Sequence, residues 1–130
     1  MTKELTTKLL YKWIKILRLE GEDIRLEFEK PQGHKEWDCT WGECMNHIHL
    51  GYSNIHIHLE LHDDLTRLEK TVIHELLHVK QMPFLNVVDC LSEQLTICEN
   101  SLLENNIERF TEMMATILYS IYYNKEAMNG

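Results

Sequence analysis

The chain has 130 residues, of which 44% are hydrophobic and 26% are charged. That length suits a single domain spanning residues 1–130, and the composition excludes a disordered, collagen-like or coiled-coil chain. The net charge of −8 repels nucleic-acid phosphates, so we expect no nucleic-acid partner. No apolar run approaches the roughly 20 residues that cross a bilayer, and Lys3, Glu4 and Lys8 interrupt the stretch where a signal peptide would be apolar. We therefore expect a cytoplasmic enzyme or binding module without a membrane partner.

The N-terminal third shows one helical and one strand-like pattern. Apolar residues recur at three- and four-residue intervals over residues 4–20, which predicts an amphipathic helix that ends at Gly21. Apolar and charged residues alternate over residues 24–28, which predicts a half-buried strand. Residues 34–45 have no clear period and are expected to form a loop with at most a short strand.

Two further alternating runs, residues 46–50 and 54–61, are joined by residues 51–53 and predict a β-hairpin with a short glycine-containing loop. Imidazoles alternate with isoleucine and leucine in both runs, so four of them are expected on one face of the hairpin: His47, His49, His56 and His58. Polar side chains on the outer face of a sheet are the ordinary interpretation, and a second metal site is the alternative.

Three helices are expected after the hairpin. Thr66 and Glu69 have the spacing of a capping box, which predicts a helix over residues 67–82 that ends before Pro83. The helix has apolar residues around most of its circumference, which indicates that it is largely buried.

Asn86 or Asp89 can cap a shorter helix that ends near residue 99. A second capping box at residues 101–104 opens a final helix that ends near residue 124. The order of helix, strand, hairpin and three helices predicts an α+β fold in which the helices pack against a small mixed or antiparallel sheet.

The helix over residues 67–82 contains the sequence His74-Glu75-Leu76-Leu77-His78. Four residues of helix place both imidazoles on one face, one turn apart, where they can bind one metal ion. Catalytic zinc takes three protein ligands and leaves a fourth position to water or substrate. Glu75 would lie beside that position and could take a proton from the water and deliver it to a leaving amine. We therefore predict a Zn²⁺ site with His74 and His78 as ligands and Glu75 as general base.

The final helix offers the third ligand, because Glu104, Glu108 and Glu112 follow one another at four-residue spacing. Glu104 falls in the predicted capping box, which gives it a local structural role. Glu108 lies on the shoulder of an apolar stripe that should face the core and is the predicted third ligand; the stripe consists of Leu103, Ile107, Phe110, Met114, Ile117 and Ile121. The alternatives are Glu93, Glu99, Glu104, Glu112 or a cysteine. Glu108 could also be an ordinary solvent-exposed glutamate on the flank of a helix.

The run Thr71-Val-Ile-His-Glu-Leu-Leu-His-Val79 and the later run Leu-Glu-Asn-Asn-Ile-Glu-Arg-Phe over residues 103–110 resemble a small gluzincin-type zinc metallopeptidase. The resemblance is closest to minimal HExxH proteins of bacteria and phages and looser to the ImmA/IrrE peptidases. It covers roughly residues 54–121, and the first fifty residues lie outside it. Leu77 stands where the family has a small residue, and no histidine follows at the metzincin spacing.

This resemblance implies a zincin-like fold, one catalytic zinc ion and a polypeptide substrate. It implies that His74, His78 and Glu108 bind the metal and that Glu75 is the general base. It also implies that the strand before the active-site helix, residues 54–61, lies along the cleft and pairs with an extended substrate. The rival function is a non-catalytic protein of the same fold, in which zinc stabilises the core and the chain binds a partner.

Other residues could have either a functional or a purely structural role. The four cysteines are expected to be thiols or ligands, because no export signal precedes them. Cys39 and Cys44 could hold a structural metal, and Gly42-Glu43-Cys44 bears a weak resemblance to the cysteine motif of peptide deformylase; Cys90 and Cys98 are expected to pack. One of three tyrosines could stabilise an oxyanion if it reached the cleft, although such residues more often pack: Tyr119, Tyr122 and Tyr123.

Overall fold

The computed structural model describes residues 1–30 and 40–129, with side chains up to residue 124. Its elements are α1 (Lys3–Ile16), β1 (Asp23–Glu27), β2 (Gly42–His47), β3 (Tyr52–Ile57), α2 (Leu65–Lys80), α3 (Met82–Leu91) and α4 (Ile97–Asn129), with short 3₁₀ turns at Leu59–Leu61 and Ser92–Gln94. The predicted α+β class is therefore confirmed, with an N-terminal helix, a small mixed sheet and three later helices.

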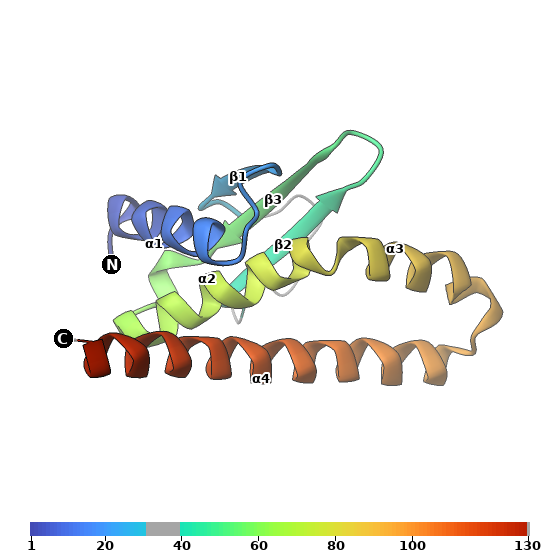
Figure 1. Cartoon of the computed structure of the whole chain (residues 1–130). Coiled ribbons are helices and arrows are strands. Elements are labelled where there is room, and N and C mark those ends of the chain that lie inside the picture. Colours follow the sequence, from blue (N-terminus) through green and yellow to red (C-terminus); the bar gives the residue numbers. More distant parts are fainter. Residues whose placement is uncertain (31–39, 130) are drawn as a thin grey trace.

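Helix α2 lies at the centre of the molecule (Figure 1). Helix α1 and the sheet pack on one side of it, and α4 runs back antiparallel along the other side. The residues between these layers are fully buried, among them Trp13, Ile55, Ile73 and Leu76. An element covered on both sides needs apolar residues around most of its surface, which is the pattern that the sequence of α2 shows. None of the helices in the described part of the chain carries an apolar stretch long enough to span a membrane.

Helix α1 ends earlier than predicted, at Ile16 instead of near residue 20. Arg18 adopts a left-handed conformation with φ of 57°, and the N–H of Leu19 donates to the carbonyl of Ile14 at 2.8 Å. This arrangement closes the helix and turns Leu19 into the core. The expected stop at Gly21 was wrong because burial of Leu19 ends the helix first.

The predicted hairpin is present, but its turn lies earlier in the chain. Strand β2 begins at Gly42, within the segment expected to be mainly loop, and residues 48–51 form the turn before β3. Gly51 has a φ of 77°, a conformation that glycine adopts without a steric penalty. Alternation over residues 46–50 thus continued past the end of the strand and was a poor guide to its limits.

The four histidines of the hairpin do not form one cluster. His47 pairs with Tyr52 and His56 pairs with Glu43 across the strands, so those two rings are well separated along the sheet. His49 is exposed in the turn, and His58 follows β3 with its Nδ1 3.2 Å from the carbonyl of Thr40. The alternative of a second metal site on this face therefore has no support in the described residues.

Strand order is β1-β3-β2, with β1 parallel and β2 antiparallel to β3. The strand before α2 is therefore the central strand, and both of its edges are paired. The expectation that residues 54–61 would pair with a substrate was wrong. Among the described residues, β2 has a strand partner on one edge only.

Helix α2 begins at Leu65, and its cap differs from the prediction. The side chain of Asp64 accepts a hydrogen bond from the backbone N–H of Thr66 at 3.0 Å. Glu69 is 1% exposed and turns toward α1, where it accepts hydrogen bonds from Trp13 Nε1 and Lys12 Nζ, both at 2.8 Å. The predicted capping box at Thr66 and Glu69 was wrong because Glu69 is used in tertiary packing.

Helices α3 and α4 also begin elsewhere than predicted. Pro83 lies in the first turn of α3, where its missing N–H has no consequence, so Asn86 and Asp89 are not caps. The capping box of α4 joins Thr96 and Glu99, each of which accepts from the other's backbone N–H, at 3.1 and 3.0 Å. The predicted box at residues 101–104 lies inside α4, so Glu104 has no capping role.

The apolar stripe expected to bury on the final helix is only partly buried. Leu103, Ile107 and Met114 are half-buried, whereas Phe110, Ile117 and Ile121 are exposed. Helix α4 contacts α2 along one side, and nothing in the described chain covers its opposite side. A stripe that spans more than one helix face therefore buries only the part that meets α2.

Replacing Glu69 with alanine is expected to lower the free energy of unfolding by about 3 kcal/mol. The change leaves Trp13 Nε1 without its acceptor and the Lys12 cation without its ion-pair partner, and it removes the acceptor of the Tyr123 hydroxyl. Urea unfolding followed by circular dichroism measures this loss. Alanine at the exposed Glu93 is the control and should change stability by less than about 0.5 kcal/mol; equal effects would contradict this role of Glu69.

The same network predicts a loss of stability at alkaline pH. Burial opposes the charge of Lys12, but its hydrogen bonds to Glu69 and Tyr123 outweigh burial and raise its pKa above the ordinary 10.5. A raised folded-state pKa contributes stability that is complete below the unfolded pKa and is lost as the pH rises toward the folded one. The free energy of unfolding should therefore fall above about pH 10.5, and less steeply in Lys12→Met. Identical pH profiles of the two proteins would contradict the prediction.

Candidate metal centre

The two histidines of the HExxH sequence project from the same side of α2. His74 and His78 are four residues apart, and their Nε2 atoms lie 3.2 Å from each other. Both side chains are 12% exposed, so they are shielded from bulk solvent without being closed off from it. The helical spacing therefore brings the rings together as predicted.

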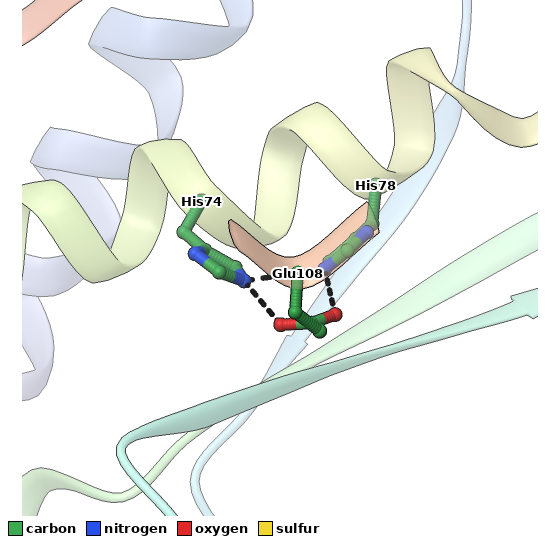
Figure 2. Close-up of side chains that lie close together, drawn as sticks. All are labelled: His74, His78 and Glu108. Carbon is green, nitrogen blue, oxygen red and sulfur yellow. Dashed lines mark hydrogen bonds and ion pairs between the residues drawn. The ribbon is translucent and has the colours of Figure 1, made fainter. Parts of the chain in front are cut away.

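Glu108 of α4 approaches both rings with its two carboxylate oxygens (Figure 2). Its Oε2 lies 3.0 Å from His74 Nε2, and its Oε1 lies 2.9 Å from His78 Nε2. Among the described residues, these three side chains are the one group whose potential ligand atoms gather within 4.8 Å. The structure thus brings together the three residues predicted as ligands, and it leaves Glu93, Glu99 and Glu104 outside the group.

This donor set suits zinc. Two neutral imidazole nitrogens and one carboxylate oxygen are a common protein ligand set for catalytic zinc. With metal–ligand distances of about 2.1 Å, tetrahedral ligand atoms lie about 3.4 Å apart. The two histidine nitrogens are 3.2 Å apart, and each lies 2.9 to 3.0 Å from a different oxygen of Glu108. Small shifts of the two rings and of the Glu108 carboxylate would admit an ion between them.

The second nitrogen of each ring also has a partner. His74 Nδ1 lies 2.8 Å from Oε2 of Glu112, whose other oxygen accepts from Arg67 at 3.0 Å. A donor Nδ1–H fixes the ring so that Nε2 is directed at the metal position, and such partners orient metal ligands generally. Glu112, one turn beyond Glu108, therefore orients a ligand and is not itself a member of the ligand group.

The partner of His78 is neutral. His78 Nδ1 lies 3.2 Å from Oε1 of Gln81, and Nε2 of Gln81 donates to Oγ1 of the fully buried Thr111 at 3.1 Å. Sequence reasoning missed Gln81 and Thr111. Their signals were the three-residue spacing from His78 to Gln81 and the position of Thr111 one residue before Glu112, which are visible only once the helix faces are known.

Glu75 lies in the wall of the same cleft. Glu75 is 5% exposed, and its Oε1 lies 3.9 Å from His74 Nε2. No described residue donates a hydrogen bond to its carboxylate. Burial raises the pKa of Glu75 to about 7, against the opposing charges of His74 and His78. A carboxylate of this kind can hold or release a proton near neutral pH.

The charges of the histidines and Glu108 are strongly coupled. Burial alone would lower the pKa of His74, but the hydrogen bond to Glu108 and the charges of Glu75 and Glu108 raise it to about 9. Hydrogen bonds from His74 and His78 hold the pKa of Glu108 well below its usual range. The metal-free site therefore holds an imidazolium paired with a carboxylate, and a metal ion would have to displace that proton.

Strand β2 reaches the site because residue 42 is a glycine. A Cβ at Gly42 would lie 2.9 Å from Cγ2 of Thr71 and 3.3 Å from Cγ of Glu75. Further along the strand, Asn46 donates to the backbone carbonyl of His78 at 3.3 Å. These contacts hold β2 beside the face of α2 that carries His74 and His78.

Two cavities adjoin the ligand group. The larger, of about 710 Å³, lies between β2, α3 and α4 and is lined by Glu75, His78 and Glu108 among others. The smaller, of about 280 Å³, is lined by Trp41, Arg67 and His74 and also by Glu75 and Glu108. Because Glu75 and Glu108 line both cavities, the two cavities flank the ligand group. An extended polymer could therefore lie across that group.

The other candidates from the sequence do not enter the site. Tyr119 Oη lies 3.2 Å from Thr66 Oγ1, Tyr123 donates to Glu69 and Tyr122 packs on Trp13, so no tyrosine of this group reaches the cleft. Tyr119 and Tyr123 contact the first half of α2, before the histidines, because α4 runs antiparallel to α2.

The cysteines also contribute no ligand in the described residues. The Cys44 thiol donates to Asn46 at 3.4 Å and lines the larger cavity, and burial raises its pKa. It does not belong to the ligand group. Cys39 lies outside the described residues, and Cys90 and Cys98 are exposed thiols, contrary to the expectation that they pack.

Comparisons of the chain with models of protein families, with curated proteins and with solved structures gave no match. What the site can do therefore follows from its own geometry and chemistry.

Proposed function

We propose that the protein is a zincin-like, zinc-dependent metallopeptidase that hydrolyses peptide bonds in a cytoplasmic polypeptide substrate. The observation that carries the proposal is the convergence of His74, His78 and Glu108 at about 3 Å beside the buried carboxylate of Glu75. A purely structural zinc site usually has four protein ligands. Three converging ligands in a cleft with a nearby base are typical of a catalytic one.

His74, His78 and Glu108 would hold the ion. When bound, zinc supplies a Lewis acid that polarises a substrate carbonyl and lowers the pKa of water. Glu75 accepts the proton of the attacking water and later delivers it to the leaving amine. Its position in the wall of the cleft beside the ligand group supports both steps, because a base there can reach a water held at the site.

The outer edge of β2 is the surface along which the substrate would lie. Gly42, Glu43, Cys44 and Asn46 line the larger cavity, which extends from the ligand group. An extended peptide that pairs with this edge would be recognised through its backbone, which suits a polypeptide substrate. This assignment replaces the strand immediately before α2, whose edges are both paired.

The rival function, a zinc-stabilised binding protein without catalysis, does not account for Glu75. The Glu75 carboxylate lines both cavities beside the ligand group, and a site that only stabilised the core would gain nothing from a base at that position. A peptidase uses that carboxylate as its base, so Glu75 favours the enzyme.

The direct test is digestion of a denatured polypeptide such as casein by the zinc-loaded protein, with new N-termini identified by mass spectrometry. We expect cleavage that is abolished by chelation and restored by added zinc. Persistence of the full-length substrate at full zinc occupancy would favour the binding protein instead.

A further inference from the structure

The larger cavity beside the ligand group has apolar walls. Leu85 and Val88 of α3 face it from one side, and Leu103 and Ile107 of α4 face it from the other. Its volume of about 710 Å³ lies within the range of pockets that enclose small ligands or large side chains. The walls can therefore cover the aliphatic part of a bound group.

The polar residues of the same cavity are acidic. Glu43 of β2, Asp89 of α3 and Glu104 of α4 line it in addition to the site residues Glu75 and Glu108, and no lysine or arginine is among its described lining residues. The buried Glu75 carboxylate, which no described residue hydrogen-bonds, also faces this space. The smaller cavity differs because it is lined by Arg67.

We propose that the larger cavity binds a lysine or arginine side chain of the substrate, next to the bond that is cleaved, and that Asp89 and Glu104 determine this specificity. The proposal rests on the proposed peptidase function and adds the substrate class: basic polypeptide segments. Lysine and arginine lay their methylene stems on apolar surface and keep the charged group in a polar environment. The apolar walls and acidic side chains of this cavity match both parts.

The spacing on α4 supports this arrangement. Glu104 precedes Glu108 by one helical turn, which is a rise of about 6 Å along the helix. The four-carbon stem of lysine has a comparable length, so a side chain that begins beside the ligand group can place its charge at Glu104. A substrate glutamate in the same position would meet the carboxylates of Asp89 and Glu104 and is expected to bind poorly.

The test uses three peptides that are identical except at one position flanking the cleaved bond, which carries lysine, norleucine or glutamate. We expect the zinc-loaded wild-type protein to cleave the lysine peptide with a kcat/KM at least about tenfold above that for the glutamate peptide. In Glu104→Lys the ratio should fall at least about tenfold, and Asp89→Asn should lower it in the same direction. Norleucine separates the contribution of the walls from that of the charge.

Glu93→Lys is the matched control, because it makes the same change in net charge at an exposed residue outside the cavity lining. It should leave the lysine-to-glutamate ratio unchanged. Equal cleavage of the lysine and glutamate peptides, or the same loss in Glu93→Lys as in Glu104→Lys, would overturn the specificity proposal while the peptidase function stands. If no peptide is cleaved at full zinc occupancy, the proposed function fails, and tighter binding of the lysine peptide, measured by calorimetry, would still support the cavity.

Discussion

Replacing Glu75 with glutamine is expected to lower kcat for peptide hydrolysis by about 10³-fold while the zinc content of the protein stays the same. Glutamine has nearly the shape of glutamate but cannot accept the proton of the attacking water. Because Glu75 lies outside the ligand group, its replacement should not weaken the metal site. Kinetics on a fluorogenic peptide, together with metal analysis of the same sample, measure both effects.

The control is Glu93→Gln, which makes the same chemical change at an exposed residue outside the lining of both cavities and should keep wild-type kcat. Retention of activity in Glu75→Gln would exclude Glu75 as the general base. Loss of zinc together with activity in that variant would show instead that Glu75 supports the metal, as the binding-protein alternative allows.

Zinc is expected to raise the melting temperature of the wild-type protein by more than about 10 °C, and alanine at Glu108 should remove most of that increase. A free zinc concentration about 1,000 times Kd stabilises the folded state by about 4 kcal/mol, and each kcal/mol shifts Tm by several degrees in a protein of this size. Glu108 supplies one of three ligand atoms and is the only one from α4. Without it, zinc would no longer link α2 to α4.

Scanning calorimetry with and without added zinc measures this shift. Glu104→Ala is the comparison, because Glu104 lies one turn away on the same helix but outside the ligand group. It should keep the wild-type response to zinc. An unchanged zinc response in Glu108→Ala would mean that another residue completes the site.

Local spacing was enough to predict that the two histidine rings meet. The interval from His74 to His78 determines that both rings share one face of a helix, whatever the helix packs against. The carboxylate of Glu108 was harder to predict, because its position depends on the course of the chain between α2 and α4. Glu108 was nevertheless identified, because it follows Ile107 in the part of the stripe that turns toward α2 and so approaches the face that carries His74 and His78.

The errors arose where tertiary contacts decide between local alternatives. Thr66 and Glu69 have the spacing of a capping box, but Glu69 gains more from Trp13 and Lys12 in the core, and Asp64 caps the helix instead. The same spacing at Thr96 and Glu99 does form a cap, because both residues are exposed and have no competing partner in the core.

The cleft itself depends on long-range contacts that leave little trace in the sequence. Strand β2 lies against α2 because Gly42 allows a close approach to Glu75 and Thr71, which only the folded chain reveals. The pairing of Gln81 with Thr111 joins residues 30 positions apart and is likewise invisible to periodicity.

The most direct measurement of the central claim is the metal content of the purified protein, determined by mass spectrometry of the intact native chain and of its His74→Ala/His78→Ala variant. A zinc site formed by His74, His78 and Glu108 predicts one zinc ion bound to each wild-type chain and none to the variant, with both proteins shown to be folded by circular dichroism. A wild-type protein that stays metal-free in the presence of zinc, or a variant that still binds one ion, would contradict it.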